Sequence, residues 1–127
     1  MAEACRRFPM PDDEQAAHAL RELSWGEHFV AGRMVASKGG SDLYLYSLKS
    51  AAVFLLDRDQ AHIGKGSDQI IKLIDVDAFI SWVRDTVGDV PLADALQEDC
   101  PADEPYHDRL GALQLLLALR MVQYGGL

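Results

Sequence analysis

The spacing of apolar residues near the start of the chain predicts a helix over residues 12–24. A proline precedes this segment and three acidic side chains open it, as the N-terminus of a helix prefers. Leu20 and Leu23 belong to its apolar face, and Gly26 is a residue that commonly ends a helix. Residues 1–10 include a proline that blocks an earlier helix start, so we expect an extended or disordered lead-in there.

Residues 28–75 carry the pattern of consecutive β-strands. The stretch KGGSD is a strong turn signal between β-favouring segments, which predicts a hairpin. The run AAVFLLD is apolar throughout and has the length of a strand, as expected for a central strand covered on both faces. Residues 43–56 can also be read as a helix, and this alternative stays open. The expected strands, about five in number, lie at residues 29–37, 43–48, 51–57, 61–63 and 69–75.

Three helices are expected after the strands. The first begins at Asp75 or Asp77 and ends near Val87, because apolar residues recur there at helical spacing. A short helix over residues 91–99 and a long one over residues 106–124 follow. Strands that cluster before helices predict an α+β fold, with an antiparallel sheet flanked by an N-terminal helix and two or three C-terminal helices.

Length and charge narrow the class of protein. The 127 residues fit a single α+β domain, residues 1–127, and the apolar fraction of 49% is enough for an ordinary globular core. The chain has 12 Lys and Arg against 20 Asp and Glu, which gives a net charge of −8. Because phosphate backbones and anionic lipids attract basic side chains, we expect neither direct nucleic-acid binding nor membrane binding.

The location that the sequence favours is the cytoplasm. The first residues have no apolar core of the length that a signal peptide needs. The longest apolar run is interrupted by Gln114 and Arg120, and it is too short to span a bilayer. Cys5 and Cys100 are not in a CxxC spacing, so both are expected to be free thiols in a reducing compartment.

One loop resembles a phosphate-binding motif. Its residues are Gly64, Lys65, Gly66 and Ser67. A P-loop has Ser or Thr directly after the lysine, whereas here a glycine intervenes, and the expected strand that follows favours a hairpin turn. If Ser67 instead caps a helix, the four residues become an anion-binding site. The protein would then bind a small molecule or a nucleotide phosphate, and an enzymatic role would be open.

No other motif indicates chemistry. His18 lies between Glu14 and Glu22 on one helix face, but a metal site needs three or four converging ligands. We read this set as a salt-bridged surface and expect no metal and no cofactor. No HxH, HxxxH or CxxC spacing and no nucleophile elbow occurs, so no catalytic residue is assigned.

The last helix is the most informative segment. Its leucines spread around nearly the whole circumference, and such a helix is buried on more than one side. If Leu113 and Leu117 face the sheet, Leu116 and Leu119 are expected at a contact with a second subunit. The sequence therefore favours a small acidic, non-catalytic protein-binding or assembly module that forms a homodimer through this helix.

Overall fold

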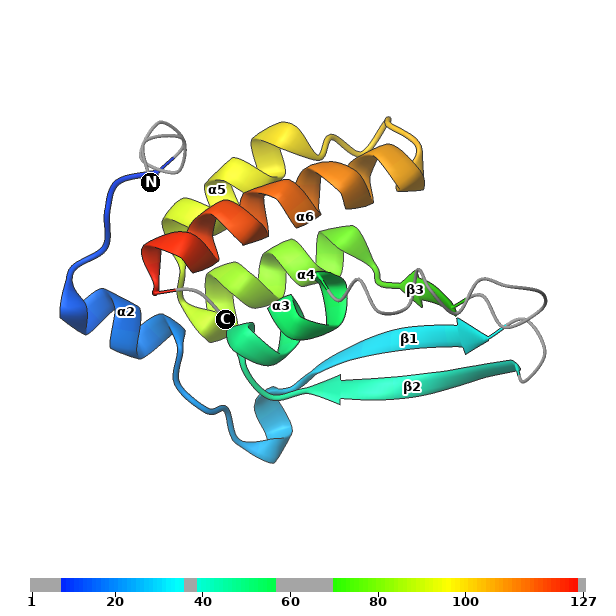
Figure 1. Ribbon diagram of the computed structural model, residues 1–127, viewed down its shortest axis with the longest axis horizontal. Coiled ribbons are helices and arrows are strands. Elements are labelled where there is room, and N and C mark those ends of the chain that lie inside the picture. Colours follow the sequence, from blue (N-terminus) through cyan, green and yellow to red (C-terminus); the bar gives the residue numbers. More distant parts are fainter. Residues whose placement is uncertain (1–7, 36–38, 57–69, 126–127) are drawn as a thin grey trace.

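The computed structural model describes residues 8–35, 39–56 and 70–125. Its class is α+β, with a small antiparallel sheet and helices stacked over one face of it (Figure 1). In the part of the chain that is described, no helix combines the length and the apolar character needed to cross a bilayer.

Within the described residues the sheet has three strands, and the predicted sheet of about five strands is not supported. The three strands are β1 (Phe29–Val35), β2 (Gly39–Leu45) and β3 (Ile70–Leu73), in the order β2-β1-β3, and both pairs are antiparallel. The predicted hairpin and the strand near residue 70 are therefore confirmed. The strand predicted at residues 61–63 lies outside the described residues.

The predicted central strand is wrong, because residues 51–56, AAVFLL, lie in α3 (Leu48–Leu56). Ala51 and Leu55 are fully buried, whereas Val53 between them is 51% exposed, which is the periodicity of a helix. Ser47 opens the helix, since its Oγ accepts a hydrogen bond from the backbone N–H of Ser50. Of residues 43–56, for which a helix was the alternative, residues 48–56 are helical, whereas residues 43–45 belong to β2.

The first helix is shorter than predicted. It is α2 (Asp13–Ala19), and a capping box joins Asp12 and Gln15 at its start. The chain leaves the helix early because the backbone N–H of Leu23 donates to the carbonyl of Tyr46, at the end of β2. A 3-10 turn, η1 (Trp25–Glu27), then leads into β1.

The three later helices agree with the sequence pattern. Asp75 caps α4 (Val76–Trp82), which continues through a π-helical turn, η3 (Val83–Val87), and ends at Gly88 with a φ of 85°. The short helix is α5 (Val90–Asp99), and the last is α6 (Tyr106–Gln123).

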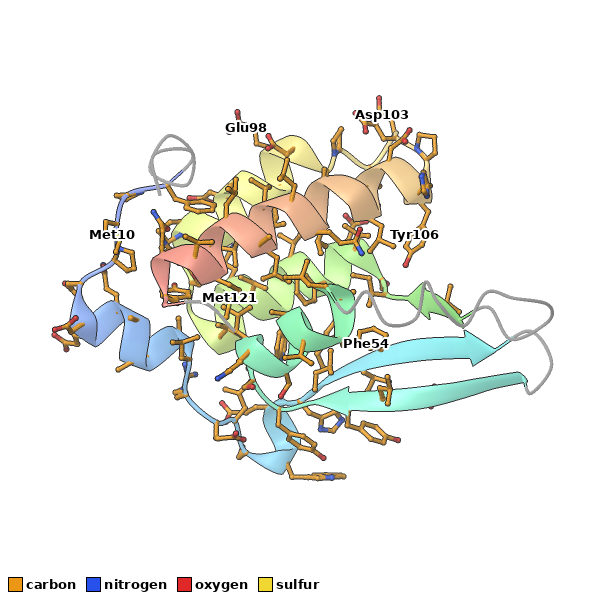
Figure 2. All side chains as sticks on the ribbon, viewed as in Figure 1. Met10, Phe54, Glu98, Asp103, Tyr106 and Met121 are labelled. Carbon is orange, nitrogen blue, oxygen red and sulfur yellow. The ribbon has the colours of Figure 1, made fainter. Side chains whose placement is uncertain are left out.

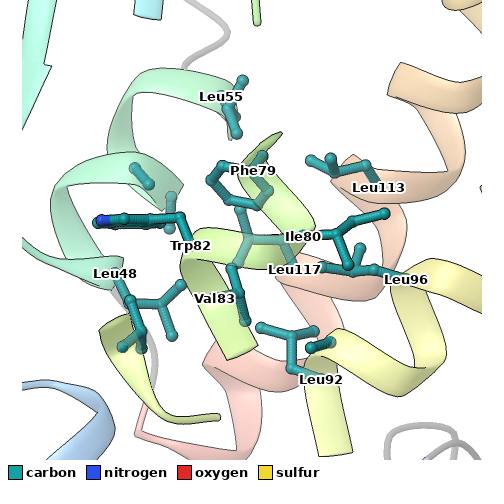
Figure 3. Close-up of a cluster of buried hydrophobic side chains, with 14 of the residues drawn as sticks. Leu48, Leu55, Phe79, Ile80, Trp82, Val83, Leu92, Leu96, Leu113 and Leu117 are labelled. Carbon is teal, nitrogen blue, oxygen red and sulfur yellow. The ribbon is translucent and has the colours of Figure 1, made fainter. Parts of the chain in front are cut away.

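The core lies between the helices and extends onto the sheet. Side chains from four helices meet there, as Figure 3 shows for Leu48 and Leu55 of α3, Phe79 and Trp82 of α4, Leu92 and Leu96 of α5, and Leu113 and Leu117 of α6. Helix α6 packs against both α5 and α3. The chain itself therefore covers α6 on two sides. This accounts for the apolar residues around most of the circumference of the helix.

Candidate functional site

The structure describes only some of the residues that the sequence predicts to form a site. The loop residues Gly64, Lys65, Gly66 and Ser67 lie outside the described residues, so anion binding there stays a prediction. Of the expected contact residues on α6, Leu116 is only 2% exposed and Leu119 is partly buried against the core. Leu116 therefore does not lie on an open face of the helix.

The face of α2 that carries His18 is linked through Arg21 to the end of the π-helical turn η3. The guanidinium of Arg21 donates to Nε2 of His18 at 3.3 Å and also to the backbone carbonyls of Thr86 and Val87, where the π-helical turn ends. Within the ranges that the structure describes, no group of three or more His, Cys, Asp or Glu side chains could hold a metal ion.

A pocket of about 340 Å³ lies between α2, the start of α5 and the end of α6. Glu14 and His18 line one side, and Asp89, Arg120 and Tyr124 line the other. The guanidinium of Arg120 donates two hydrogen bonds to the Asp89 carboxylate, at 2.9 and 3.0 Å, and the hydroxyl of Tyr124 donates to the same carboxylate. The sequence offers one signal for this set, which is Arg120 within an apolar stretch of α6, because a charge in such a position needs a buried partner.

The remaining donors of Arg120 bind the chain's own lead-in and helix end. Its Nη1 donates to the carbonyl of Pro9 at 3.1 Å and to Oε1 of Gln123 at 2.7 Å, while Nε2 of Gln123 donates to the carbonyl of Phe8. The guanidinium carbon lies 5.0 Å from the ring centroid of Phe8 and 4.8 Å from that of Tyr124. This network fastens the N-terminal segment to α5 and α6.

Two titratable side chains, Tyr124 in this pocket and Cys100 at the end of α5, are poorly suited to proton transfer or nucleophilic attack near neutral pH. Burial, followed by the hydrogen bond to Asp89, raises the pKa of the Tyr124 hydroxyl, so it holds its proton. Burial also raises the pKa of the Cys100 thiol, and the Asp99 and Glu104 carboxylates add to that effect. Since the thiolate is the reactive form, Cys100 is a weak nucleophile.

The outer face of the sheet exposes large apolar side chains. Phe29 points inward, because its ring lies 5.3 Å from Phe79 and 5.5 Å from Trp82 of α4. Successive side chains of a strand alternate between faces, so the next residue, Val30, points outward with Tyr44 opposite it. Val30 is 47% exposed and Tyr44 is 54% exposed. Leu73, which is 40% exposed, belongs to the same face of β3.

Aromatic rings extend this face beyond the strands. Trp25 is 77% exposed, and its ring centroid lies 5.5 Å from that of His28. The imidazole of His28 in turn meets Tyr44 edge-on at 4.9 Å. We call Trp25, His28, Val30, Tyr44 and Leu73 together the aromatic sheet surface.

The turn that presents Trp25 is held firmly. Ser24 and Glu27 form a capping box, and the indole N–H of Trp82 donates to the carbonyl of Glu27 at 2.8 Å. The hydrogen bonds from Ser24, first from its backbone and then from its side chain, lower the pKa of the Glu27 carboxyl. The sequence signal for this turn is SWGE, in which a serine lies three residues before a glutamate and the tryptophan lies between them.

Comparison with protein-family models, with curated proteins and with solved structures finds no match for this chain.

Proposed function

We propose that this protein is a non-catalytic protein-binding module whose binding face is the aromatic sheet surface. The observation that carries the proposal is the 77% exposure of Trp25 on a turn held in place beside an exposed sheet face. Large aromatic side chains are enriched among the residues that contribute most to protein–protein binding. Exposed apolar patches on soluble domains commonly mark interaction sites.

The state of the polar side chains Arg120, Tyr124 and Cys100 supports a binding role over catalysis. In the pocket beside α2, the guanidinium of Arg120 is occupied by Asp89, Gln123 and Pro9. Two groups that could serve as an acid or a nucleophile, Tyr124 and Cys100, hold their protons because their pKa values are raised. A cytoplasmic location is part of the proposal, and the buried free thiol of Cys100 is compatible with it.

Site-specific photocrosslinking in the cells that produce the protein tests the binding face. A photoreactive amino acid at Val30 is expected to give discrete adducts with one or a few proteins. The same amino acid at Asp103, which projects from the far side of the helices (Figure 2), is expected to give none. Val30 is half exposed, so the replacement leaves the core intact. The absence of adducts at Val30, or equal adducts at both positions, would refute the proposal.

Self-association through α6 is a second candidate, which two exposed side chains favour. Leu115 is 61% exposed and Val122 is 46% exposed. They lie seven positions apart, which places both on one side of the helix. Two copies that bury such a stripe would form a symmetric contact, the commonest arrangement of a homodimer.

Light scattering at tens of micromolar measures this association. We expect the wild type to have the mass of a dimer and the double variant Leu115→Glu with Val122→Glu to be a folded monomer, because each glutamate places a charge in the apolar contact. A monomeric wild type would exclude a dimer at these concentrations. Circular dichroism of the double variant is the control for folding.

A further inference from the structure

Strand β2 forms one edge of the sheet. It pairs with β1 without interruption, from Phe29 opposite Leu45 to Val35 opposite Gly39, so no bulge bends it away. Across residues 8–35, 39–56 and 70–125, no strand pairs with its outer side. The strand is seven residues long, which is long enough to template another strand.

The backbone groups that face this edge can be assigned from one hydrogen bond. In a strand, successive residues direct their N–H and C=O groups to alternate sides. The carbonyl of Tyr46 accepts the N–H of Leu23, away from β1. Tyr44, Asp42 and Gly40 lie two, four and six positions before Tyr46, so their N–H and C=O groups also point to the outer side. All three residues are exposed.

Strand β2 carries few of the residues that usually protect an edge strand. Its sequence, GGSDLYL, has no lysine, arginine or proline, and Asp42 is its single charged residue. Asp42 and Tyr44 are two positions apart, so both side chains belong to the outer face of the sheet, which also carries Val30. An added strand would place its own side chains beside these two residues.

We propose that the outer edge of β2 binds an extended segment of a partner protein as an additional antiparallel strand. The segment carries lysine or arginine opposite Asp42 and an apolar residue two positions away, opposite Tyr44. This inference rests on the proposed protein-binding function and names the class of partner. The net charge of −8 also favours a basic segment.

A second copy of the chain is a poor occupant of this edge. The central residue of β2 is Asp42. Two antiparallel copies of β2 that overlap over their full length would therefore place the two Asp42 side chains directly opposite each other. Like charges at such a position destabilise strand pairing.

The probe for the test is an acetylated and amidated heptapeptide of sequence TVTKTVT, which aligns valine, lysine and valine with Gly40, Asp42 and Tyr44. Amide hydrogen exchange measured by NMR supplies a readout for each residue of β2. Without peptide, we expect fast exchange at Asp42 and Tyr44 and slow exchange at Leu43, which pairs with Ala31. With peptide, the Asp42 and Tyr44 amides become protected.

Matched controls separate strand pairing from general adhesion. Methyl groups on the backbone nitrogens of both valines and the lysine remove the donors that face β2, and we expect binding to weaken at least about tenfold. Glutamate in place of lysine is expected to weaken binding about twofold to fivefold. The substitution Asp42→Lys should reverse that preference between the two peptides.

Three outcomes would overturn the edge proposal. They are unchanged exchange of the Asp42 and Tyr44 amides, equal binding of the methylated peptide, and protection of these amides by a second copy without any peptide. None of them bears on the crosslinks at Val30. If those crosslinks form while the peptide fails, the protein-binding function stands and only the mode of binding is wrong.

Discussion

Replacing Arg120 with methionine is expected to lower the free energy of unfolding by about 3–5 kcal/mol, because it leaves the Asp89 carboxylate buried without its partner. The side chains of Arg120 and Asp89 are 3% and 1% exposed. The same change removes the hydrogen bonds that hold Pro9 and Gln123. Such a loss is a large share of the stability of a domain, typically about 5–15 kcal/mol. Urea unfolding followed by circular dichroism measures it.

An exposed ion pair supplies the control for this experiment. Arg84 lies 2.7 Å from Asp94, and their side chains are 31% and 64% exposed. Arg84→Met is expected to cost less than about 1 kcal/mol, since water screens the pair. Adding Asp89→Asn to Arg120→Met should recover part of the loss, because the uncompensated charge is gone and asparagine still caps α5. Equal losses for the two arginine variants would contradict our account of the buried pair.

Truncation of Leu116 to alanine is expected to destabilise the protein by about 2–5 kcal/mol, the range for large-to-small changes in a core. This leucine is 2% exposed and lies among the side chains that α6 contributes to the core. Its neighbour Leu115 is 61% exposed, so Leu115→Ala should change the free energy of unfolding by no more than about 0.5 kcal/mol. Both variants are measured by the same urea titration.

The comparison between these neighbours tests the orientation of α6. The two substitutions remove the same atoms from adjacent positions, so helix propensity contributes equally to both. A larger loss at Leu115 than at Leu116 would mean that the helix turns its other side to the core. The exposed stripe proposed for self-association would then be misplaced as well.

Local signals predicted most of the helices. Asp75 before an apolar periodic segment and Gly88 after it mark the limits of α4 and its π-helical extension, and both residues have these roles in the structure. The hairpin of β1 and β2 followed from the glycine-rich turn between β-favouring segments. Such signals depend on a few neighbouring residues, and this is why a single sequence reveals them.

The segment at residues 51–57 shows where local signals end. A short continuous apolar run suits a covered strand and a buried helix equally well. Packing decides the matter here, since Ala51, Ala52 and Leu55 are buried in a helix that packs against α6. Gln114 of α6 donates a hydrogen bond to the carbonyl of Leu55. The strand predicted at residues 51–57 is therefore absent from the three strands of the described sheet.

The sequence by itself determined the α+β class, the hairpin, the limits of the later helices and the acidic charge, because these depend on composition and on neighbours along the chain. Only the tertiary structure decided that Leu116 is buried, that Arg120 pairs with Asp89, and that Trp25 and Tyr44 share an exposed surface. Each of these depends on which element covers which face. That choice is made by packing between segments far apart in the chain, and no local pattern contains it.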